Sequence, residues 1–495
     1  MPVLNKENWQ NIVITLATRF ILVAFLLTKF WRKRLLARVA TKRIAQGELK
    51  VPHLLLSSLN NKRLQDIKKS NLLRFKSNIL TTTPTQPVNL PVLKKGHNKS
   101  VLLVVHNSLP YDSAGYAHRT IREAKAYQAL GYCVSIVTRQ GYPWDLAKHR
   151  NQLDTKSNVI DGIEIFTLKG NRRYKVDSDL KYAIEYGNQV AILAKKLDVG
   201  FIQASSNYIN GLAGYIASRK SGIPFLYEAR GMWHVTRASK EKGFSSTEAY
   251  KYEEAIERWV INNASAAIFI TNELRKKYSN SALTKTAVLP NCIDDSEPVS
   301  QPSLSYRRNS KFRLLYAGSI VFYEGLDLLV EVVSKLESNG IELSIYGGGP
   351  DSNKIEGLIS KLDSNNIHFF GRVEQFEVKQ AYGSHHAVVV PRINSKVTSL
   401  VPPLKPLEAI WNGLPVITSD LPAIREIMGG VGSVLYIKPS NEQSLRCAIL
   451  KLQDEYEIFA AKVKADQAYI LKERSWKEQL GRAINQLSCK SFYSD

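Results

Sequence analysis

Residues 388–419 read VVVPRINSKVTSLVPPLKPLEAIWNGLPVITS. The apolar, β-branched run from Ala387 to Pro391 predicts a strand that is buried on both faces. A short helix is expected to begin at Lys405-Pro406 and to stop at Gly413, because proline suits the first helical turn and glycine the C-terminal end. A strand, a helix and another strand in this order form the repeating unit of a parallel α/β sheet.

The predicted helix also carries candidate binding groups. Backbone amides at a helix start, with Lys405 beside them, are suited to a diphosphate. Glu408, one turn further along, can accept hydrogen bonds from the hydroxyls of a ribose. The alternative is an ordinary strand-to-helix turn whose charges face solvent.

Short apolar runs alternate with helical patterns on both sides of this segment, which predicts parallel sheets in two successive halves. The strands expected in the first half are residues 101–105, 133–138, 163–168, 201–204, 225–228 and 267–271. Those expected in the second half are residues 313–317, 343–346, 367–370, 387–391, 415–418 and 433–436. Two Rossmann-like domains would then face each other, with ligand bound between them at the carboxyl ends of the strands. The predicted domains are residues 101–294 and 311–465, followed by a C-terminal helix and tail over 466–495.

The chain has 495 residues, 44% of them hydrophobic, which excludes a wholly disordered or collagenous protein. Its formal net charge of +24 is concentrated in the first hundred residues. An apolar stretch at 12–30, interrupted by Arg19 and Lys29, precedes a cluster of tryptophan, arginine and lysine. We expect residues 1–79 to form a basic helical extension on an anionic membrane surface, and residues 80–100 a linker.

Other interpretations of this basic segment stay open. It could be a membrane span, or a solvated basic helix packed on the main body. A role in nucleic-acid binding is not expected, because no nucleic-acid-binding motif accompanies the charge. Four widely separated cysteines and the lack of an uninterrupted signal-peptide core favour a cytoplasmic enzyme that lies peripherally on the membrane.

The segment 388–419 resembles the signature of the family 4 glycosyltransferases, which are retaining enzymes of the GT-B fold. Further resemblances, in the same order along the chain, are YAG at 316–318, YEGLD at 323–327, YGGGP at 346–350 and FGRV at 370–373. The resemblance implies an α/β protein of two Rossmann-like domains that face each other across a cleft. It also implies a nucleotide-diphospho-sugar as donor and a glycan or lipid-linked acceptor.

Carried over by position, the resemblance gives donor-binding residues. Glu408 is expected to bind the ribose, the backbone at Arg372 and Val373 to meet the base, and Gly318 to flank the phosphates. Leu404 belongs to the run LKPLE, which is similar to a subgroup of the family.

Two departures from the family pattern concern charge. Leu400 stands where the family has a glutamate that contacts the donor sugar, and Ser319 and Glu324 stand approximately where it has an arginine and a lysine. We therefore expect Lys405, with Arg392, to stabilise the leaving diphosphate. Fixed donors aimed at such a charge contribute about 3 to 4 kcal/mol each, so no metal is expected.

The first half supplies candidates for the acceptor side. Glu228 ends a predicted strand and Arg230 comes two residues later, so their side chains point the same way and can pair or bind sugar hydroxyls and phosphate. A structural salt bridge is the alternative. The stretches GYxxRT and YExRGxW are similar to the same subgroup, which implies catalytic roles for Glu228 and Arg230 beside Lys405. Other residues implied near donor or acceptor are Gly115, His106, Tyr116, Arg119 and Trp233.

These expectations combine into a retaining glycosyltransferase active in polysaccharide or glycoconjugate synthesis. Two rivals remain at this point. A catalytically silent GT-B protein could bind glycan or act as a scaffold, as Leu400 and Ser319 suggest. A sugar-nucleotide epimerase would instead release an altered sugar nucleotide without any acceptor.

Overall fold

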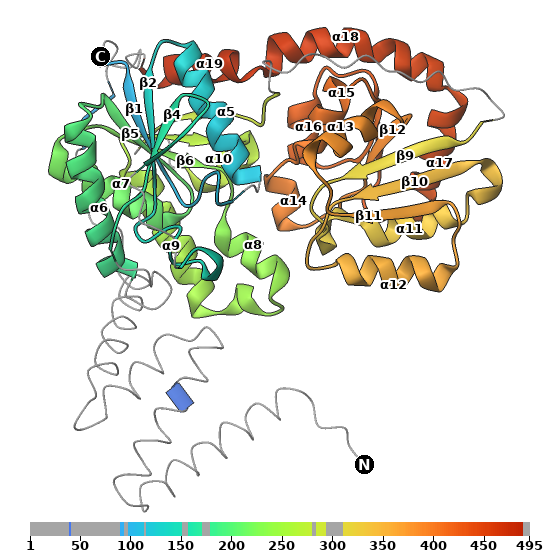
Figure 1. Cartoon of the computed structure of the whole chain (residues 1–495), viewed down its shortest axis with the longest axis horizontal. Helices are drawn as coiled ribbons and strands as arrows, with labels where there is room; N and C mark the ends of the chain where they lie inside the picture. Colours follow the sequence, from blue (N-terminus) through green and yellow to red (C-terminus); the bar gives the residue numbers. More distant parts are fainter. Residues whose placement is uncertain are drawn as a thin grey trace, which may run out of the picture.

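The computed structural model describes residues 39–40, 90–93, 98–112, 115–150, 157–170, 179–279, 284–293 and 310–488. They form two α/β domains that lie side by side (Figure 1). Nearly all of the predicted basic extension and most of the predicted linker lie outside the described residues.

The N-terminal domain is built on a sheet with the strand order β3-β4-β2-β1-β5-β6-β7-β8. Its strands are β1 Ser100–Val105, β2 Cys133–Thr138, β3 Ser157–Ile160, β4 Ile163–Phe166, β5 Phe201–Ser205, β6 Phe225–Ala229, β7 Ala266–Phe269 and β8 Lys285–Val288. The pairs are parallel except β3 with β4. The helices are α5 Gly115–Ala129, α6 Asp179–Lys196, α7 Tyr208–Ser221, α8 Trp233–Lys240, α9 Glu248–Asn263 and α10 Asn272–Tyr278.

The C-terminal domain has a parallel sheet with the strand order β11-β10-β9-β12-β13-β14. Its strands are β9 Phe312–Ala317, β10 Ile341–Tyr346, β11 Ile367–Gly371, β12 Ala387–Val390, β13 Val416–Ser419 and β14 Val434–Ile437. The helices are α11 Leu326–Ser334, α12 Ser352–Leu362, α13 Gln375–Gly383, α14 Lys396–Leu400, α15 Lys405–Trp411, α16 Pro422–Met428, α17 Glu442–Asp454, α18 Tyr456–Arg474 and α19 Trp476–Ser488.

Both faces of each sheet are covered, so every sheet contributes to two apolar cores. In β1, Leu102 and Val104 pack toward α6 and α7, whereas Leu103 and Val105 pack on the opposite face. The alternation explains why the strand sequence is apolar throughout.

All twelve predicted strands are present, with ends that differ by one or two residues. The sequence analysis missed β3, β8 and α14. β3 (SNVI) and β8 (KTAV) are edge strands of four residues with polar members, and α14 is a helix of five residues, so none has a long periodic pattern. Helix α5 ends shortly before Gly131, whose φ of 82° is left-handed.

The C-terminal helices connect the two domains. α18 runs along the C-terminal domain and α19 returns to the N-terminal domain (Figure 1). There, Trp476, Leu480 and Leu487 are buried in the core next to α5 and β8. The predicted boundary between residues 465 and 466 falls inside α18, because the helix continues across it. The segment that leads from the N-terminal to the C-terminal domain contacts the end of α18, since the Ile293 amide donates to the Arg474 carbonyl at 3.0 Å.

Across the ranges that the structure describes, no helix combines the length and the apolar character needed to cross a membrane.

Candidate functional site

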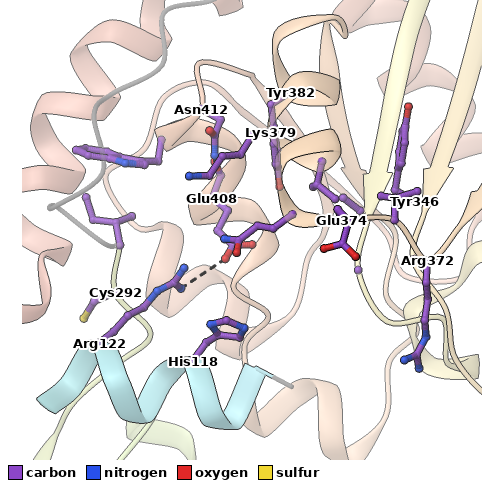
Figure 2. Close-up of a pocket in the computed structure, with 18 residues that line it drawn as sticks. His118, Arg122, Cys292, Tyr346, Arg372, Glu374, Lys379, Tyr382, Glu408 and Asn412 are labelled. Atoms are coloured by element: carbon purple, nitrogen blue, oxygen red, sulfur yellow. Dashed lines mark hydrogen bonds and ion pairs between the residues drawn. The ribbon is translucent and has the colours of Figure 1, made fainter. Parts of the chain in front are cut away.

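A cavity of about 610 Å³ lies between the domains, at the carboxyl ends of β9, β10 and β11 (Figure 2). The C-terminal domain forms most of its wall. The residues that follow the three strands are Ala317, Gly318, Tyr346, Gly347, Arg372 and Val373. Helix α5 and the hinge segment with Cys292 and Ile293 form the opposite wall. The cavity is therefore at the place where facing parallel sheets bind ligands.

Two glycines let the loops at the floor of the cavity approach each other. A Cβ on Gly347 would lie 1.9 Å from the Gly318 carbonyl oxygen, and a Cβ on Gly318 would lie 2.2 Å from Lys405 Cε. Both glycines have positive φ, of 135° and 146°. The Gly318 amide donates to the Tyr346 carbonyl at 2.9 Å, which ties the two loops together. Only glycine fits this close backbone packing without strain.

Glu408 projects into the cavity from α15, and Arg122 faces it from α5 across the gap (Figure 2). The Arg122 guanidinium and the Glu408 carboxylate are 3.7 Å apart. The two side chains are 18% and 37% exposed, so the pair is accessible to a ligand. The sequence analysis found Glu408 but missed Arg122 and its neighbour His118. The sequence signal for these two residues was their spacing, because residues four apart, such as His118 and Arg122, lie on the same face of a helix.

Helix α13 supplies the remaining wall, which the sequence analysis also missed. Glu374 caps the helix in a capping box with Glu377. Four residues at helical spacing then line the cavity: Gln375, Val378, Lys379 and Tyr382. Burial raises the pKa of Tyr382, so its hydroxyl stays protonated.

Lys405, Glu324 and Arg392 form a buried triad beside Gly318. Lys405 Nζ is 2.6 Å from the Glu324 carboxylate and 2.6 Å from the Tyr316 hydroxyl, and Arg392 Nε is 3.2 Å from Glu324. Burial alone would raise the pKa of Glu324, but Lys405 and Arg392 outweigh it and hold that pKa below its usual value. Burial lowers the pKa of Lys405, and Glu324 offsets this only in part. With all three ionised, the triad keeps one net positive charge.

The structure separates the predicted donor-side residues into two groups. Gly318, Arg372, Val373 and Glu408 line the cavity together. Lys405, Arg392 and Leu404 do not line it, and Lys405 lies directly behind Gly318. The unusual Leu400 is buried against the N-terminal core, next to Met232 and Val235 of that domain. Apolar contact between the domains therefore occupies the position where the family has a sugar-contacting glutamate.

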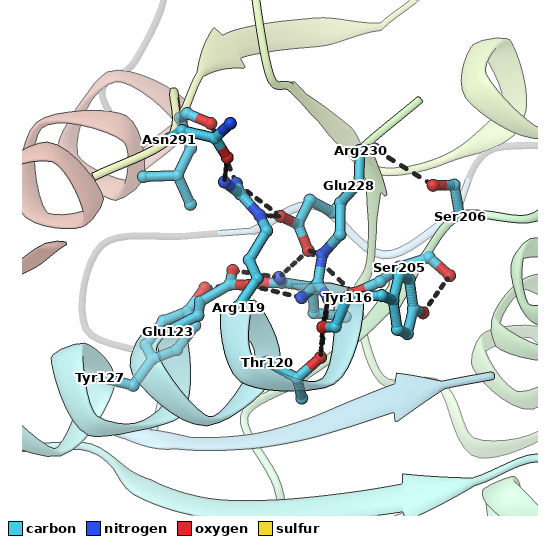
Figure 3. Close-up of polar contacts among 12 residues, drawn as sticks. Tyr116, Arg119, Thr120, Glu123, Tyr127, Ser205, Ser206, Glu228, Arg230 and Asn291 are labelled. Carbon is cyan, nitrogen blue, oxygen red and sulfur yellow. Dashed lines mark hydrogen bonds and ion pairs between the residues drawn. The ribbon is translucent and has the colours of Figure 1, made fainter. Parts of the chain in front are cut away.

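A second cluster of charges is buried inside the N-terminal domain (Figure 3). Glu228 binds Arg119 at 3.0 Å and Arg230 at 2.8 Å, and Arg230 also binds Glu123 at 2.7 Å. Burial would raise the pKa of Glu228, but the two guanidinium groups outweigh it and lower that pKa. Burial, with the Glu228 charge added, raises the pKa of Glu123. Gln203 donates to both carboxylates.

Glu228 and Arg230, for which catalytic roles are expected, are both held within this cluster. Glu228 is 0% exposed and Arg230 7%, and neither lines the cavity. Their polar atoms bind one another, Ser205 and Thr120, so the alternative interpretation as a structural salt bridge describes them. The network satisfies charges that burial would otherwise make costly.

Arg119 and Tyr116 belong to the same network. Arg119 donates to the carbonyl groups of Leu289 and Pro290 and to the Asn291 side chain, so it fixes the hinge between the domains. The Tyr116 hydroxyl accepts from the His106 amide, and its ring lies 4.8 Å from the Arg230 guanidinium.

The remaining predicted residues, His106, Trp233 and Gly115, do not line the cavity between the domains. The Trp233 ring meets the His106 ring edge-on at 4.8 Å, and Trp233 lines a second hollow in the N-terminal domain. Gly115, expected near the donor, is exposed at the start of α5 and lines neither hollow. Nothing lies within 4 Å of a Cβ built there, so this position does not require glycine.

Within the described ranges, no three His, Cys, Asp or Glu side chains are grouped so that they could hold a metal ion. The adjacent His385 and His386 are structural, because the first bonds the Ala381 carbonyl and the second accepts from the Arg313 amide.

Comparison with known proteins adds sequence and fold relatives. The family described as glycosyl transferase 4-like domain matches residues 114–292, and glycosyl transferases group 1 matches residues 311–455. D-rhamnosyltransferase WbpZ of Pseudomonas aeruginosa is 26% identical over 193 residues, which are 38% of this chain and 48% of WbpZ. The O-antigen chain mannosyltransferase RfbU of Salmonella typhimurium is 27% identical over 121 residues, 24% of this chain and 32% of RfbU. These alignments span less than half of either relative.

Solved structures resemble the fold over most of the chain. Sucrose-phosphate synthase of Thermosynechococcus elongatus has a TM-score of 0.62 at 16% identity and covers 78% of this chain and 98% of its own. Anabaena HepE in complex with UDP-glucose has a TM-score of 0.58 at 12% identity and covers 79% and 99%. The first family matches the domain of α5 and the second the domain of Glu408, in the order that the two sheets follow along the chain. The chain thus has the GT-B fold, and each of its two domains matches one glycosyltransferase family model.

Proposed function

We propose that the protein transfers a sugar from a nucleotide-diphospho-sugar to a glycan or lipid-linked acceptor, with retention at the anomeric carbon. The observation that carries the proposal is the cavity between the domains, with Glu408 on one wall and Arg122 on the other. The bond from the anomeric carbon to the β-phosphate oxygen breaks, and a bond to an acceptor oxygen forms. The acceptor proton passes to the departing diphosphate.

The cavity offers partners for the base, the ribose and the phosphates of the donor. Glu408 accepts from the ribose hydroxyls, and Arg122 holds its carboxylate toward the cavity. The base lies against the backbone of Arg372 and Val373, and the phosphates pass Gly318. The Anabaena HepE structures hold UDP and UDP-glucose, so UDP-sugars are the first donors to test.

Charge on the leaving diphosphate is stabilised by the triad of Lys405, Glu324 and Arg392. The triad is buried and carries one net positive charge directly behind Gly318. A fixed charge in a water-poor site acts more strongly than one in solvent. In this proposal the triad supplies the positive charge that a metal ion would otherwise provide.

The acceptor is proposed to be a surface polysaccharide or its lipid-linked precursor. The support is that one curated relative is a rhamnosyltransferase and another an O-antigen chain mannosyltransferase. The basic segment within residues 1–79 would bring the enzyme to the cytoplasmic face of an anionic membrane. Deleting residues 1–50 should then abolish sedimentation with anionic liposomes, and equal sedimentation of both forms would refute this part.

The test of the reaction is release of nucleoside diphosphate from UDP-, GDP- and ADP-sugars, with and without EDTA. Lys405→Ala should lower turnover about 100-fold or more, because it removes a fixed charge near the leaving group. Lys354→Ala is the matched control, since its ion pair with Asp327 is exposed at the protein surface. Equal turnover of the two variants would remove Lys405 from the reaction, and full loss with EDTA would refute metal independence.

A catalytically silent GT-B protein is the second candidate. It is favoured by Leu400, which packs between the domains where the family has a sugar-contacting glutamate. Turnover of any nucleotide-sugar by the purified chain would exclude it. Nucleotide binding without turnover, across donors and acceptors, would support it.

A further inference from the structure

A second hollow, of about 720 Å³, lies in the N-terminal domain at the carboxyl ends of β5 and β6. It shares no lining residue with the cavity between the domains. Its walls come from α8, from the first turns of α6 and α7, and from α9. The volume falls within the range of about 300 to 1,000 Å³ that is typical of small-molecule sites.

Trp233 supplies a large aromatic surface in this hollow. It is 40% exposed, although tryptophan is usually well buried in folded domains. The ring is held by its edge-on contact with His106, which directly follows β1. Its indole N–H makes no hydrogen bond to any part of the chain that the structure describes. An exposed aromatic ring in a polar hollow is suited to the apolar C–H face of a pyranose.

Asn207 adds a hydrogen-bond donor to the hollow. The residue is 1% exposed, and its Oδ1 accepts from the Ile209 amide at 2.9 Å, which caps α7. Its amide nitrogen makes no hydrogen bond within the described ranges. The nitrogen is not among the buried atoms that lack a partner, so it keeps contact with solvent and can donate to a ligand. Asn207 lines the hollow, which gives a bound hydroxyl access to this donor.

The charged side chains that line the hollow restrict the charge of the ligand that can bind there. Arg237 is engaged by Glu241 at 2.9 Å and by Glu253 at 3.3 Å. Asp179 accepts from the hydroxyl groups of Tyr208 at 2.9 Å and Tyr252 at 3.4 Å. Three carboxylates and two cations line the hollow, so the net charge is −1. This charge disfavours phosphates and uronic acids and favours neutral or amino sugars.

We propose that the second hollow binds one neutral or amino-sugar unit of the acceptor. Trp233 stacks on the ring, and the Asn207 amide donates to a hydroxyl. The unit held there is separate from the sugar being transferred, since the two cavities have no residue in common. The assignment to an acceptor rests on the proposed function, but binding of the sugar itself does not.

The test measures saccharide binding to the full-length protein by saturation-transfer NMR. The probes are methyl α-D-mannopyranoside, N-acetylglucosamine, glucosamine and glucuronic acid. We expect binding of at least one of the first three and about tenfold weaker binding by Trp233→Ala. Asn207→Ser should weaken binding in the same direction while keeping the helix cap, because serine caps as well as asparagine. Phe376→Ala is the control, because Phe376 is 60% exposed and lines neither hollow.

Binding of UDP and GDP is measured on the same samples, together with the melting temperature. Equal saccharide binding by Trp233→Ala and the folded wild type would overturn the inference, as would no binding of any probe. Stronger binding of glucuronic acid than of the neutral sugars would also overturn it. Saccharide binding that depends on Trp233, with no nucleotide binding or turnover, would refute the proposed function and leave this site standing.

Discussion

Glu324→Gln is the most informative perturbation of the triad. The carboxylate lies between Lys405 and Arg392, and its side chain is 6% exposed. Removing it leaves two cations buried together without a counter-charge. Breaking a buried ion pair in this way costs about 3 to 5 kcal/mol. For a domain of this size that loss corresponds to a fall in melting temperature of roughly 6 to 20 °C.

The pH dependence of the stability loss is a more specific test of the triad than the size of that loss. Without Glu324, burial and the Arg392 charge lower the pKa of Lys405 further. An unfolded chain keeps a lysine pKa of about 10.4, so between the two values the unfolded state binds more protons. Stability then rises with pH, and the deficit of the variant should shrink from pH 7 toward pH 10.

On the acid side, the deficit of the variant shrinks as the pH falls. In the wild type the pKa of Glu324 is lowered, so its contribution is present above the unfolded value of about 4.3 and is lost as pH falls through the folded value. The variant should lack this acid-sensitive contribution.

Thermal unfolding of wild type and variant from about pH 2 to about pH 10 measures both effects. Glu442→Gln is the control, because its ion pair with Lys335 is about half exposed and such pairs contribute about 0 to 1 kcal/mol. A Glu324→Gln protein that melts with the wild type at pH 7 would refute the reasoning. A deficit that stays constant up to pH 10 would show that Lys405 does not carry the uncompensated charge.

Three further predictions concern the cavity and the domain interface. Glu408→Ala should weaken binding of the nucleoside diphosphate about tenfold to a hundredfold in calorimetry, and an unchanged Kd would remove it from the ribose. Gly318→Ala should lower the melting temperature, because its Cβ would lie 2.2 Å from Lys405 Cε, whereas Gly115→Ala meets no atom within 4 Å and should be neutral. Equal melting of these two alanine variants would contradict the structure. Glu426→Ala removes three hydrogen bonds from Asn272 across the domains, so the radius of gyration in small-angle scattering should increase, and an unchanged radius would argue against this contact.

The sheets could be predicted from sequence because their strands are buried on both faces. Runs such as VLLVV at 101–105 and AVVV at 387–390 need no partner to be recognised. β3 and β8 lie at the edges of their sheet and contain polar residues, so their strand character depends on a neighbour that sequence does not reveal. The return of α19 to the N-terminal domain is equally a matter of tertiary contact.

The donor-side residues were predictable where a strand end places them. Gly318, Arg372 and Val373 follow β9 and β11, and parallel strands bring such positions to one edge. Glu228 lies near the end of β6 and Arg230 directly follows the strand, but both are buried, because Arg119 and Glu123 of α5 cover them. A buried ion pair and a catalytic pair can have the same charges at the same motif positions. Only the packing of another element distinguishes them.

Helix α5 explains how the two charge clusters relate. One face carries Arg119 and Glu123, four residues apart, which bind β6 and the hinge from within the domain. The next face carries His118 and Arg122, also four residues apart, which line the cavity. The buried network thus fixes the rotation of α5 about its axis, and that rotation aims Arg122 at Glu408 of the other domain. Substitution of Glu228 would act on donor binding through the orientation of this helix, so loss of activity alone would not identify Glu228 as a catalytic residue.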